Sequence, residues 1–188
     1  MSELTTNEIK PSMKVEVDNE PYVVVSNQFV KPGKGQAFNR IRIKNLITGR
    51  NVEKTYKSGE KLTLADIEEV SMRLLYKEKD DAIFMNDVTF EQLSIPLSAI
   101  KDNVIWLKDD VVYDIVLYKG TVIDVAPPTF MELKITESAP GVRGDTSSGR
   151  VLKPATLETG AKIQIPIFVD EGEIIKVDTR TAEYVSRV

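Results

Sequence analysis

Alternating apolar and polar positions predict short β-strands along the chain. Period-two alternation is clearest in residues 38–46, where Ile41 and Ile43 fall on one face of the expected strand. A helical turn or short helix is expected at residues 96–100, and no stretch has the pattern of a helix of ordinary length. Strands are predicted at residues 13–17, 22–25, 38–46, 52–56, 67–76, 82–85, 111–118, 121–125, 131–135, 161–169, 173–177 and 184–188.

Turn sequences and prolines divide these strands into three modules, residues 1–64, 65–127 and 128–188. Pro127 and Pro128 mark the second boundary, because a double proline cannot continue a sheet ladder. Short strands at this spacing, in modules of about 60 residues, are typical of small barrels, and the later two modules fit the oligonucleotide/oligosaccharide-binding (OB) pattern. The predicted fold class is therefore all-β, with three consecutive small barrels.

Residues 30–38, VKPGKGQAF, read as the tip of a hairpin between two strands. Pro32, Gly33 and Gly35 are turn-forming residues, and Lys34 stands between the two glycines with no neighbouring side chain to shield it. The sequence predicts an arm that extends a lysine toward a partner, and a plain solvated turn is the alternative. A phosphate-cradling loop would need GxxxxGK[ST] or GxGxxG before a helix, and neither is present.

Three basic residues follow on the outgoing strand. Arg40, Arg42 and Lys44 recur at period two and so share one face. Such a basic stripe could follow a phosphate backbone, or it could be an ordinary solvated face.

Composition narrows the chemistry. The 188 residues include no cysteine and no histidine, which excludes disulfides, thiol nucleophiles, Ser-His-Asp triads and the usual zinc sites. Paired carboxylates at Asp80-Asp81 and Asp109-Asp110 fit solvated turns better than a metal or acid/base site. We therefore expect no catalytic residue and no metal. The N-terminus has no signal-peptide pattern and no apolar run approaches membrane-spanning length, so a cytoplasmic protein is expected.

Charge is unevenly distributed although the net charge is only -4. Residues 1–64 carry 11 basic and 7 acidic side chains, residues 65–127 carry 6 and 13, and residues 128–188 carry 8 and 9. The basic excess of the first module indicates an anionic partner for that module, while the acidic middle could simply keep the protein soluble.

Aromatic residues are scarce, at 7% of the chain. We expect Trp106 in the core, together with Phe84, Phe90, Phe130 and Phe168. Residues 140–150 form a polar stretch without periodicity, which predicts either a functional loop or disorder.

Three segments give the chain a resemblance to a known family. These are KPGKGQAF at 31–38, the block GDTSSGR and KPATLETGAKIQIPIF over 144–168, and DTRTAEYVSRV at 178–188. They closely resemble bacterial elongation factor P, and the similarity covers the whole chain. The resemblance implies an SH3-like (KOW-type) domain followed by two OB-folds, arranged in an L shape similar to tRNA.

The family also implies a function. Its members bind the 70S ribosome between the peptidyl and exit sites, contact both subunits, and promote peptide-bond formation at consecutive prolines. The tip lysine, here Lys34, reaches toward the CCA end of peptidyl-tRNA. In the branch with a PGKG tip it typically carries a β-lysyl group, sometimes hydroxylated, added by an enzyme resembling a lysyl-tRNA synthetase. No cofactor is implied, and we expect a monomer that is not itself an enzyme and has no membrane partner.

Positioning the tRNA end in reactive geometry lowers the entropic part of the barrier and needs no acid, base or nucleophile. The expected RNA contacts of the tip module are Arg40, Arg42 and Lys44. In the third module, the resemblance implies contacts from Gly144, Asp145 and Thr146 near the exit-site codon and from Tyr184 and Arg187, although Tyr184 could equally close the barrel.

Two other functions stay open on the residues alone. A general single-stranded RNA-binding protein would use the OB-folds, but it needs aromatic platforms interleaved with basic residues. A carboxylate-metal enzyme is the other class, and no motif supports it.

Overall fold

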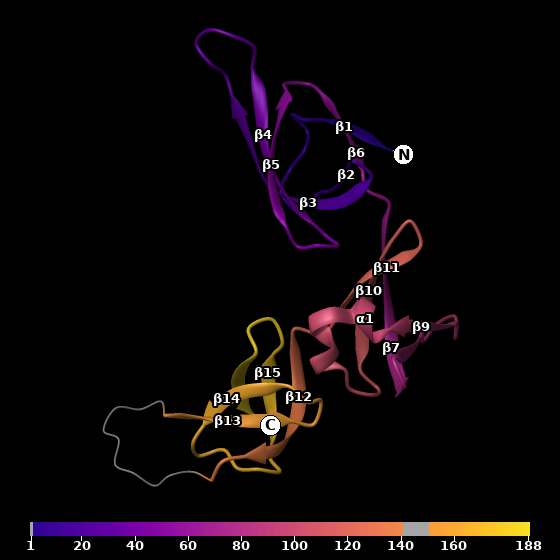
Figure 1. Cartoon of the computed structure of the whole chain (residues 1–188), viewed down its shortest axis with the longest axis vertical. Coiled ribbons are helices and arrows are strands. Elements are labelled where there is room, and N and C mark those ends of the chain that lie inside the picture. The colour runs from indigo at the N-terminus through magenta and orange to yellow at the C-terminus, as the bar shows by residue number, and fades with distance from the viewer. Residues whose placement is uncertain (1, 141–150) are drawn as a thin grey trace. The chain divides into compact units, whose positions relative to one another are not determined.

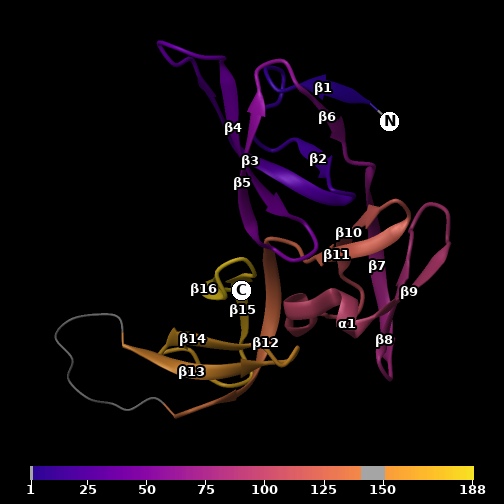
Figure 2. The same cartoon turned by 45° about the horizontal axis from the view of Figure 1, so that its top comes forward.

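The computed structural model describes residues 2–140 and 151–188 and is nearly all β (Figures 1 and 2). Its strands form three sheets, the last of which closes into a barrel. The all-β prediction is confirmed. The residues group into two compact units, Met1–Val70 with Ile115–Asp124, and Ser71–Asp114 with Val125–Val188.

The first sheet has the strand order β1-β6-β2-β3-β4-β5. Its interior is aliphatic, and Val15 and Ile41 are fully buried in it. The hairpin between β2 and β3 turns at Asp18 and Asn19, both with positive φ, which Asn and Asp tolerate better than other side chains. The strands are β1 (Glu3–Thr5), β2 (Lys14–Val17), β3 (Glu20–Val30), β4 (Phe38–Asn45), β5 (Asn51–Lys57) and β6 (Lys61–Leu64).

The second sheet has the order β11-β10-β7-β8-β9. Phe84 and Tyr113 meet edge to face in its interior, with ring centroids 5.7 Å apart. The Tyr113 hydroxyl donates to the Trp106 carbonyl at 2.7 Å, and burial raises the pKa of Tyr113 to about 12. The elements are β7 (Ile67–Glu78), β8 (Asp81–Met85), β9 (Gln92–Pro96), helix α1 (Leu97–Ile100), the 3-10 helix η1 (Lys101–Trp106), β10 (Val112–Tyr118) and β11 (Thr121–Ala126).

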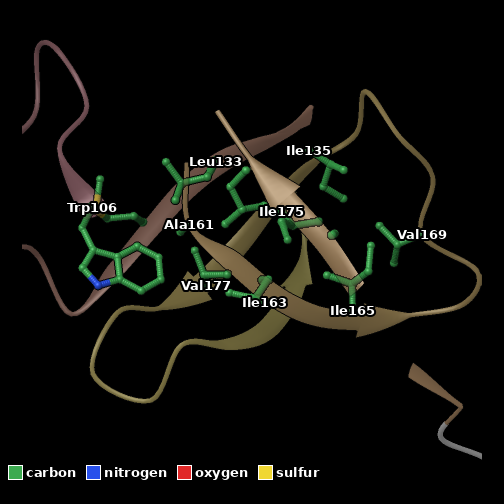
Figure 3. Packing of buried hydrophobic residues seen from close by; sticks show 12 residues of the cluster. Trp106, Leu133, Ile135, Ala161, Ile163, Ile165, Val169, Ile175 and Val177 are labelled. Atoms are coloured by element: carbon green, nitrogen blue, oxygen red, sulfur yellow. The ribbon is translucent and has the colours of Figure 1, made fainter. Parts of the chain in front are cut away.

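The third sheet is a closed five-strand barrel with the order β12-β13-β14-β16-β15. Leu133, Ile165 and Ile175 are fully buried in its core, and Trp106 belongs to the same cluster (Figure 3). In that view Trp106 lies at one end of the cluster and Val169 at the other. The strands are β12 (Phe130–Ser138), β13 (Leu152–Leu157), β14 (Lys162–Pro166), β15 (Ile174–Asp178) and β16 (Glu183–Arg187).

Four strands were missing from the sequence prediction, namely β1, β6, β9 and β13. Three of them span only three to five residues, too few for a clear period of two. Strand β13 contains Pro154, a residue that argues against a strand assignment, yet the residues on both sides of it pair with β14.

The expectation of four buried phenylalanines is wrong for three of them. Phe84 is fully buried, but Phe90, Phe130 and Phe168 are exposed at 70%, 47% and 61%. Trp106, at 3% exposure, is buried as expected.

Candidate nucleic-acid interface

Lys34 lies in the connection between β3 and β4, which are paired as far as Val30 and Phe38. This long hairpin projects beyond the rest of the first sheet (Figure 1). Lys34 is exposed, and its ammonium makes no hydrogen bond or ion pair with any residue that the structure describes. The lysine side chain is therefore accessible from solvent at the end of the hairpin.

The backbone around Lys34 is shaped by the residues that flank it. Gly35 has φ of +115°, a conformation that side chains with a Cβ rarely adopt. Gly33 has no such requirement, and a Cβ added there would meet none of the described atoms within 4 Å. The amide of Ser58 donates to the Ala37 carbonyl at 3.0 Å, which fixes the outgoing end of the loop.

The basic stripe lies on the outer face of β4. Arg40, Arg42 and Lys44 are exposed and alternate with buried residues, as the period of two requires. Arg42 faces Glu53 across the β4–β5 ladder, and the Arg40 Nε lies 3.4 Å from the Glu53 Oε1. Both partners are about half exposed, so this ion pair is weak and would compete poorly with a phosphate.

Two asparagines fasten the stem of the hairpin from inside. Asn27 donates through Nδ2 to the carbonyls of Thr6 at 2.7 Å and Ile9 at 2.8 Å, and Asn39 donates to the Asn27 Oδ1 at 3.0 Å. Asn39 is only 2% exposed, and its Oδ1 has no partner among the described atoms. This asparagine pair was not predicted from the sequence. The sequence feature that could have indicated the pair is the amide at position 39. It lies on the buried face of the strand, where Ile41 and Ile43 are apolar.

A polar cluster joins the β10–β11 hairpin to the β2–β3 hairpin within the first unit. The Tyr118 hydroxyl donates to the Glu16 Oε2 at 2.7 Å, and the Lys119 ammonium lies 2.9 Å from the same oxygen. Lys119 also donates to the Asn19 Oδ1 at 3.2 Å. The hydrogen bond from Tyr118, followed by that from Lys119, lowers the pKa of Glu16.

The candidate residues of the third barrel divide into two groups. Gly144, Asp145 and Thr146 lie outside the described residues. Tyr184 is half-buried and packs against the barrel core, whereas Arg187 is exposed.

Arg187 makes several contacts within the barrel. Its Nε lies 3.2 Å from the Glu173 Oε2, its guanidinium lies 4.9 Å from the centre of the Phe168 ring, and it donates to the Phe168 carbonyl. An apolar groove of about 1220 Å³ runs beside these residues and is lined by both Tyr184 and Phe168. The structure therefore brings an aromatic ring that was expected in the core next to the two predicted RNA contacts.

Among the residues that the structure describes, no group of three or more carboxylates is placed to hold a metal ion. None of the described helices is long and apolar enough to cross a membrane.

The fold is shared with solved structures of known proteins. Two such structures have the same fold over about two thirds of this chain. One is the eukaryotic translation initiation factor 5A from Methanococcus jannaschii, with TM-score 0.56, 20% identity, and coverage of 67% of this chain and 92% of that one. The other is a translation initiation factor of the eif-5a family from Naegleria fowleri, with TM-score 0.53, 13% identity, and coverage of 66% and 95%. At these identities the likeness shows the fold alone.

Sequence comparisons then define the family. Three family models match in order, the elongation factor P (EF-P) KOW-like domain at residues 5–62, the EF-P OB domain at 67–125 and the EF-P C-terminal domain at 131–187. The proteins named elongation factor P 2 from Protochlamydia amoebophila and Chlamydia trachomatis are 62% and 57% identical over 100% of this chain and 99% of theirs. The chain belongs to the elongation factor P family of translation elongation factors.

Proposed function

We propose that this protein binds the 70S ribosome between the peptidyl and exit sites and positions the CCA end of peptidyl-tRNA through Lys34. It thereby promotes peptide-bond formation at consecutive prolines. The observation that carries the proposal is Lys34, exposed and without a polar partner among the described residues, at the end of a long hairpin whose loop and stem are both held by hydrogen bonds. Membership of a translation elongation factor family supports the ribosome as the place of action.

The residues of the hairpin are suited to positioning the tRNA end rather than to bond chemistry. Proline is a rigid peptidyl donor, so holding the tRNA end in a reactive geometry removes part of the entropic barrier. A cationic arm can donate hydrogen bonds to RNA backbone oxygens without taking part in bond formation. A β-lysyl extension of Lys34, added by an enzyme resembling a lysyl-tRNA synthetase, would lengthen this arm. The factor acts as a cytoplasmic monomer that contacts both ribosomal subunits and is not itself an enzyme.

The basic stripe and the third barrel supply the remaining contacts of the proposal. Arg40, Arg42 and Lys44 lie along the acceptor-stem phosphates, and the third barrel, through Gly144, Asp145, Thr146, Tyr184 and Arg187, approaches the exit-site codon. The domain boundaries at residues 64 and 127 and the L-shaped, tRNA-like arrangement stay predictions.

A second candidate is general single-stranded RNA binding by the OB-folds. The observation that favours it is the groove beside Phe168, Tyr184 and Arg187, which places aromatic rings next to a cation. Affinity for bare oligonucleotides separates the two functions. Weak binding to RNA with firm binding to 70S ribosomes supports the translation factor, and tight, sequence-blind binding to RNA supports the alternative.

The proposed function is tested by reconstituted translation of a message that encodes three consecutive prolines. The reactions contain no factor, the native protein with its Lys34 modification checked by intact mass, or the Lys34→Ala variant. We expect the native protein to relieve the stall and the variant to fail. A stall that persists with the confirmed modified protein would contradict the proposal, and relief by the variant would remove Lys34 from it.

A further inference from the structure

The connection between β8 and β9 exposes two large apolar side chains. Val88 and Phe90 are 85% and 70% exposed, the highest values among the large hydrophobic residues that the structure describes. Single exposed apolar residues are ordinary, but here two stand on one six-residue turn. The second sheet thus carries a small apolar knob, Val88 with Phe90.

The turn that carries the knob is internally fixed. The Asn86 Oδ1 accepts hydrogen bonds from the amides of Val88 at 2.8 Å and Thr89 at 3.1 Å. The Asn86 carbonyl accepts from the Phe90 amide at 2.9 Å, and the Asn86 amide donates to the Glu91 carbonyl at 3.0 Å. Because one residue makes all four bonds, the turn presents the knob in a defined orientation.

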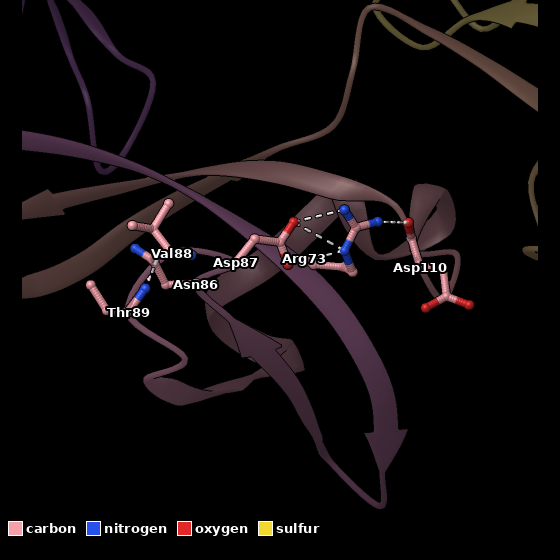
Figure 4. Close-up of polar contacts among 6 residues, drawn as sticks. All are labelled: Arg73, Asn86, Asp87, Val88, Thr89 and Asp110. Carbon is pink, nitrogen blue, oxygen red and sulfur yellow. Dashed lines mark hydrogen bonds and ion pairs between the residues drawn. The ribbon is translucent and has the colours of Figure 1, made fainter.

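A second contact holds the turn against the sheet (Figure 4). Arg73 on β7 donates through Nε and Nη2 to the Asp87 carboxylate, at 3.1 and 2.7 Å, and through Nη1 to the Asp110 carbonyl at 2.6 Å. Figure 4 shows Asp87 directed toward Arg73 and Val88 on the other side of the turn. The ion pair therefore does not cover the Val88 side chain.

Phe90 occupies a position where both the backbone conformation and the exposure to solvent disfavour phenylalanine. Its φ is +60°, in the left-handed region where glycine and asparagine are favoured and bulky residues are rare. Its ring is also mostly in water, so it contributes little burial in return. A residue that suits neither its backbone nor its environment points to a role outside the folded chain.

The surrounding charge selects the kind of partner. Asp87, Glu91, Asp109 and Asp110 are all exposed, and Arg73 is the one cation that the hydrogen bonds of this turn include. An acidic surface repels RNA phosphates and attracts a basic surface. We propose that the Val88–Phe90 knob docks into an apolar pocket on a basic protein of the ribosome. This inference rests on the proposed function, because it takes the ribosome as the partner.

Site-specific photo-crosslinking tests which component the knob contacts. The full chain carries p-benzoylphenylalanine in place of Phe90, or, in a second preparation, in place of Gln36 beside Lys34. Each is irradiated with 70S ribosomes that hold peptidyl-tRNA, and the adducts are digested separately with nuclease and protease. We expect the position-90 adduct to survive nuclease and to disappear with protease.

Three other results would count against the inference. An RNA adduct at position 90 would overturn it, and so would no adduct there while the position-36 probe crosslinks. No adduct from either probe would overturn the proposed function and this inference with it.

Variants that suit the backbone measure the contribution of the knob. Phe90→Asn fits a positive φ, so its melting temperature should be no lower than that of the native chain. We expect its dissociation constant for 70S ribosomes to rise by about tenfold, the effect of losing a buried aromatic anchor. Tyr76→Thr, which removes another exposed aromatic ring from the same sheet, is the matched control and should bind normally. Unchanged binding by Phe90→Asn would contradict the proposal.

Discussion

At the scale of single residues, the backbone of Gly35 decides where Lys34 points. Its φ of +115° costs a residue with a Cβ about 1–2 kcal/mol, which the loop would relieve by changing shape. Gly33, which precedes Lys34, has open space around it and does not have a positive φ. The same substitution at Gly33 is therefore a matched control.

Replacing each glycine by alanine, one at a time, tests whether the loop conformation that places Lys34 is needed for activity. We expect Gly35→Ala to slow peptide-bond formation between prolines by about tenfold, because the lysine is displaced from its working geometry. Gly33→Ala should stay close to the native rate. The measurement is the rate of dipeptide formation on ribosomes stalled at proline, and equal rates for both variants would contradict a shaped loop.

The cluster around Glu16 makes stability depend on pH in a predictable direction. The pKa of Glu16 is lowered from the ordinary value of 4.5. The contribution of Glu16 to the free energy of unfolding is therefore complete above that value and is lost as the pH falls through the pKa of the folded state. We expect Tyr118→Phe to lower the free energy of unfolding by about 1 kcal/mol at pH 7 and by less at pH 3. Urea unfolding at the two pH values measures this, and a difference of equal size at both would contradict a charge-dependent bond.

At the scale of elements, β4 is the part of the site that the sequence predicts best. An alternating strand places every second residue on one face, so the exposure of Arg40, Arg42 and Lys44 followed from spacing alone. The asparagine pair beneath it did not, since its partners Thr6 and Ile9 are distant in sequence. Local patterns predict which face a residue occupies, whereas long-range hydrogen bonds depend on how separate strands meet.

The same limit explains the exposed phenylalanines. Phe90 lies in a turn whose conformation is set by the Asn86 side chain and by Arg73 from another strand. Phe168 lies at a barrel surface beside Arg187. A phenylalanine is expected in the core by composition, and nothing local in the sequence shows that the chain turns it outward.

A test of the stripe belongs to this scale. Replacing Arg40, Arg42 and Lys44 with glutamine should weaken ribosome binding and reduce the slope of log affinity against log salt by about 2–3, one phosphate contact for each residue. Replacing Lys77, Lys79 and Lys101 removes the same charge from the acidic middle segment and is the control. Filter binding over a salt series measures both, and an unchanged slope for the stripe variant would contradict phosphate contacts.

At the scale of the whole molecule, the first module and the middle segment differ in charge and in the kind of surface that they expose. The first module is basic and carries the Lys34 hairpin, and the middle segment is acidic and carries the Val88–Phe90 knob. A single ribosomal factor would use the first for RNA and the second for protein, which is why a net charge of -4 does not argue against an RNA partner.

The most direct measurement is the rate of peptide-bond formation between prolyl-tRNA donors and acceptors, by quench-flow at several temperatures. It compares ribosomes alone, with the modified native protein, and with Lys34→Ala. We expect the native protein to raise the rate mainly through a less unfavourable activation entropy, and Lys34→Ala to leave the rate near that of ribosomes alone. Equal acceleration by the variant, or an acceleration that is wholly enthalpic, would contradict positioning by Lys34.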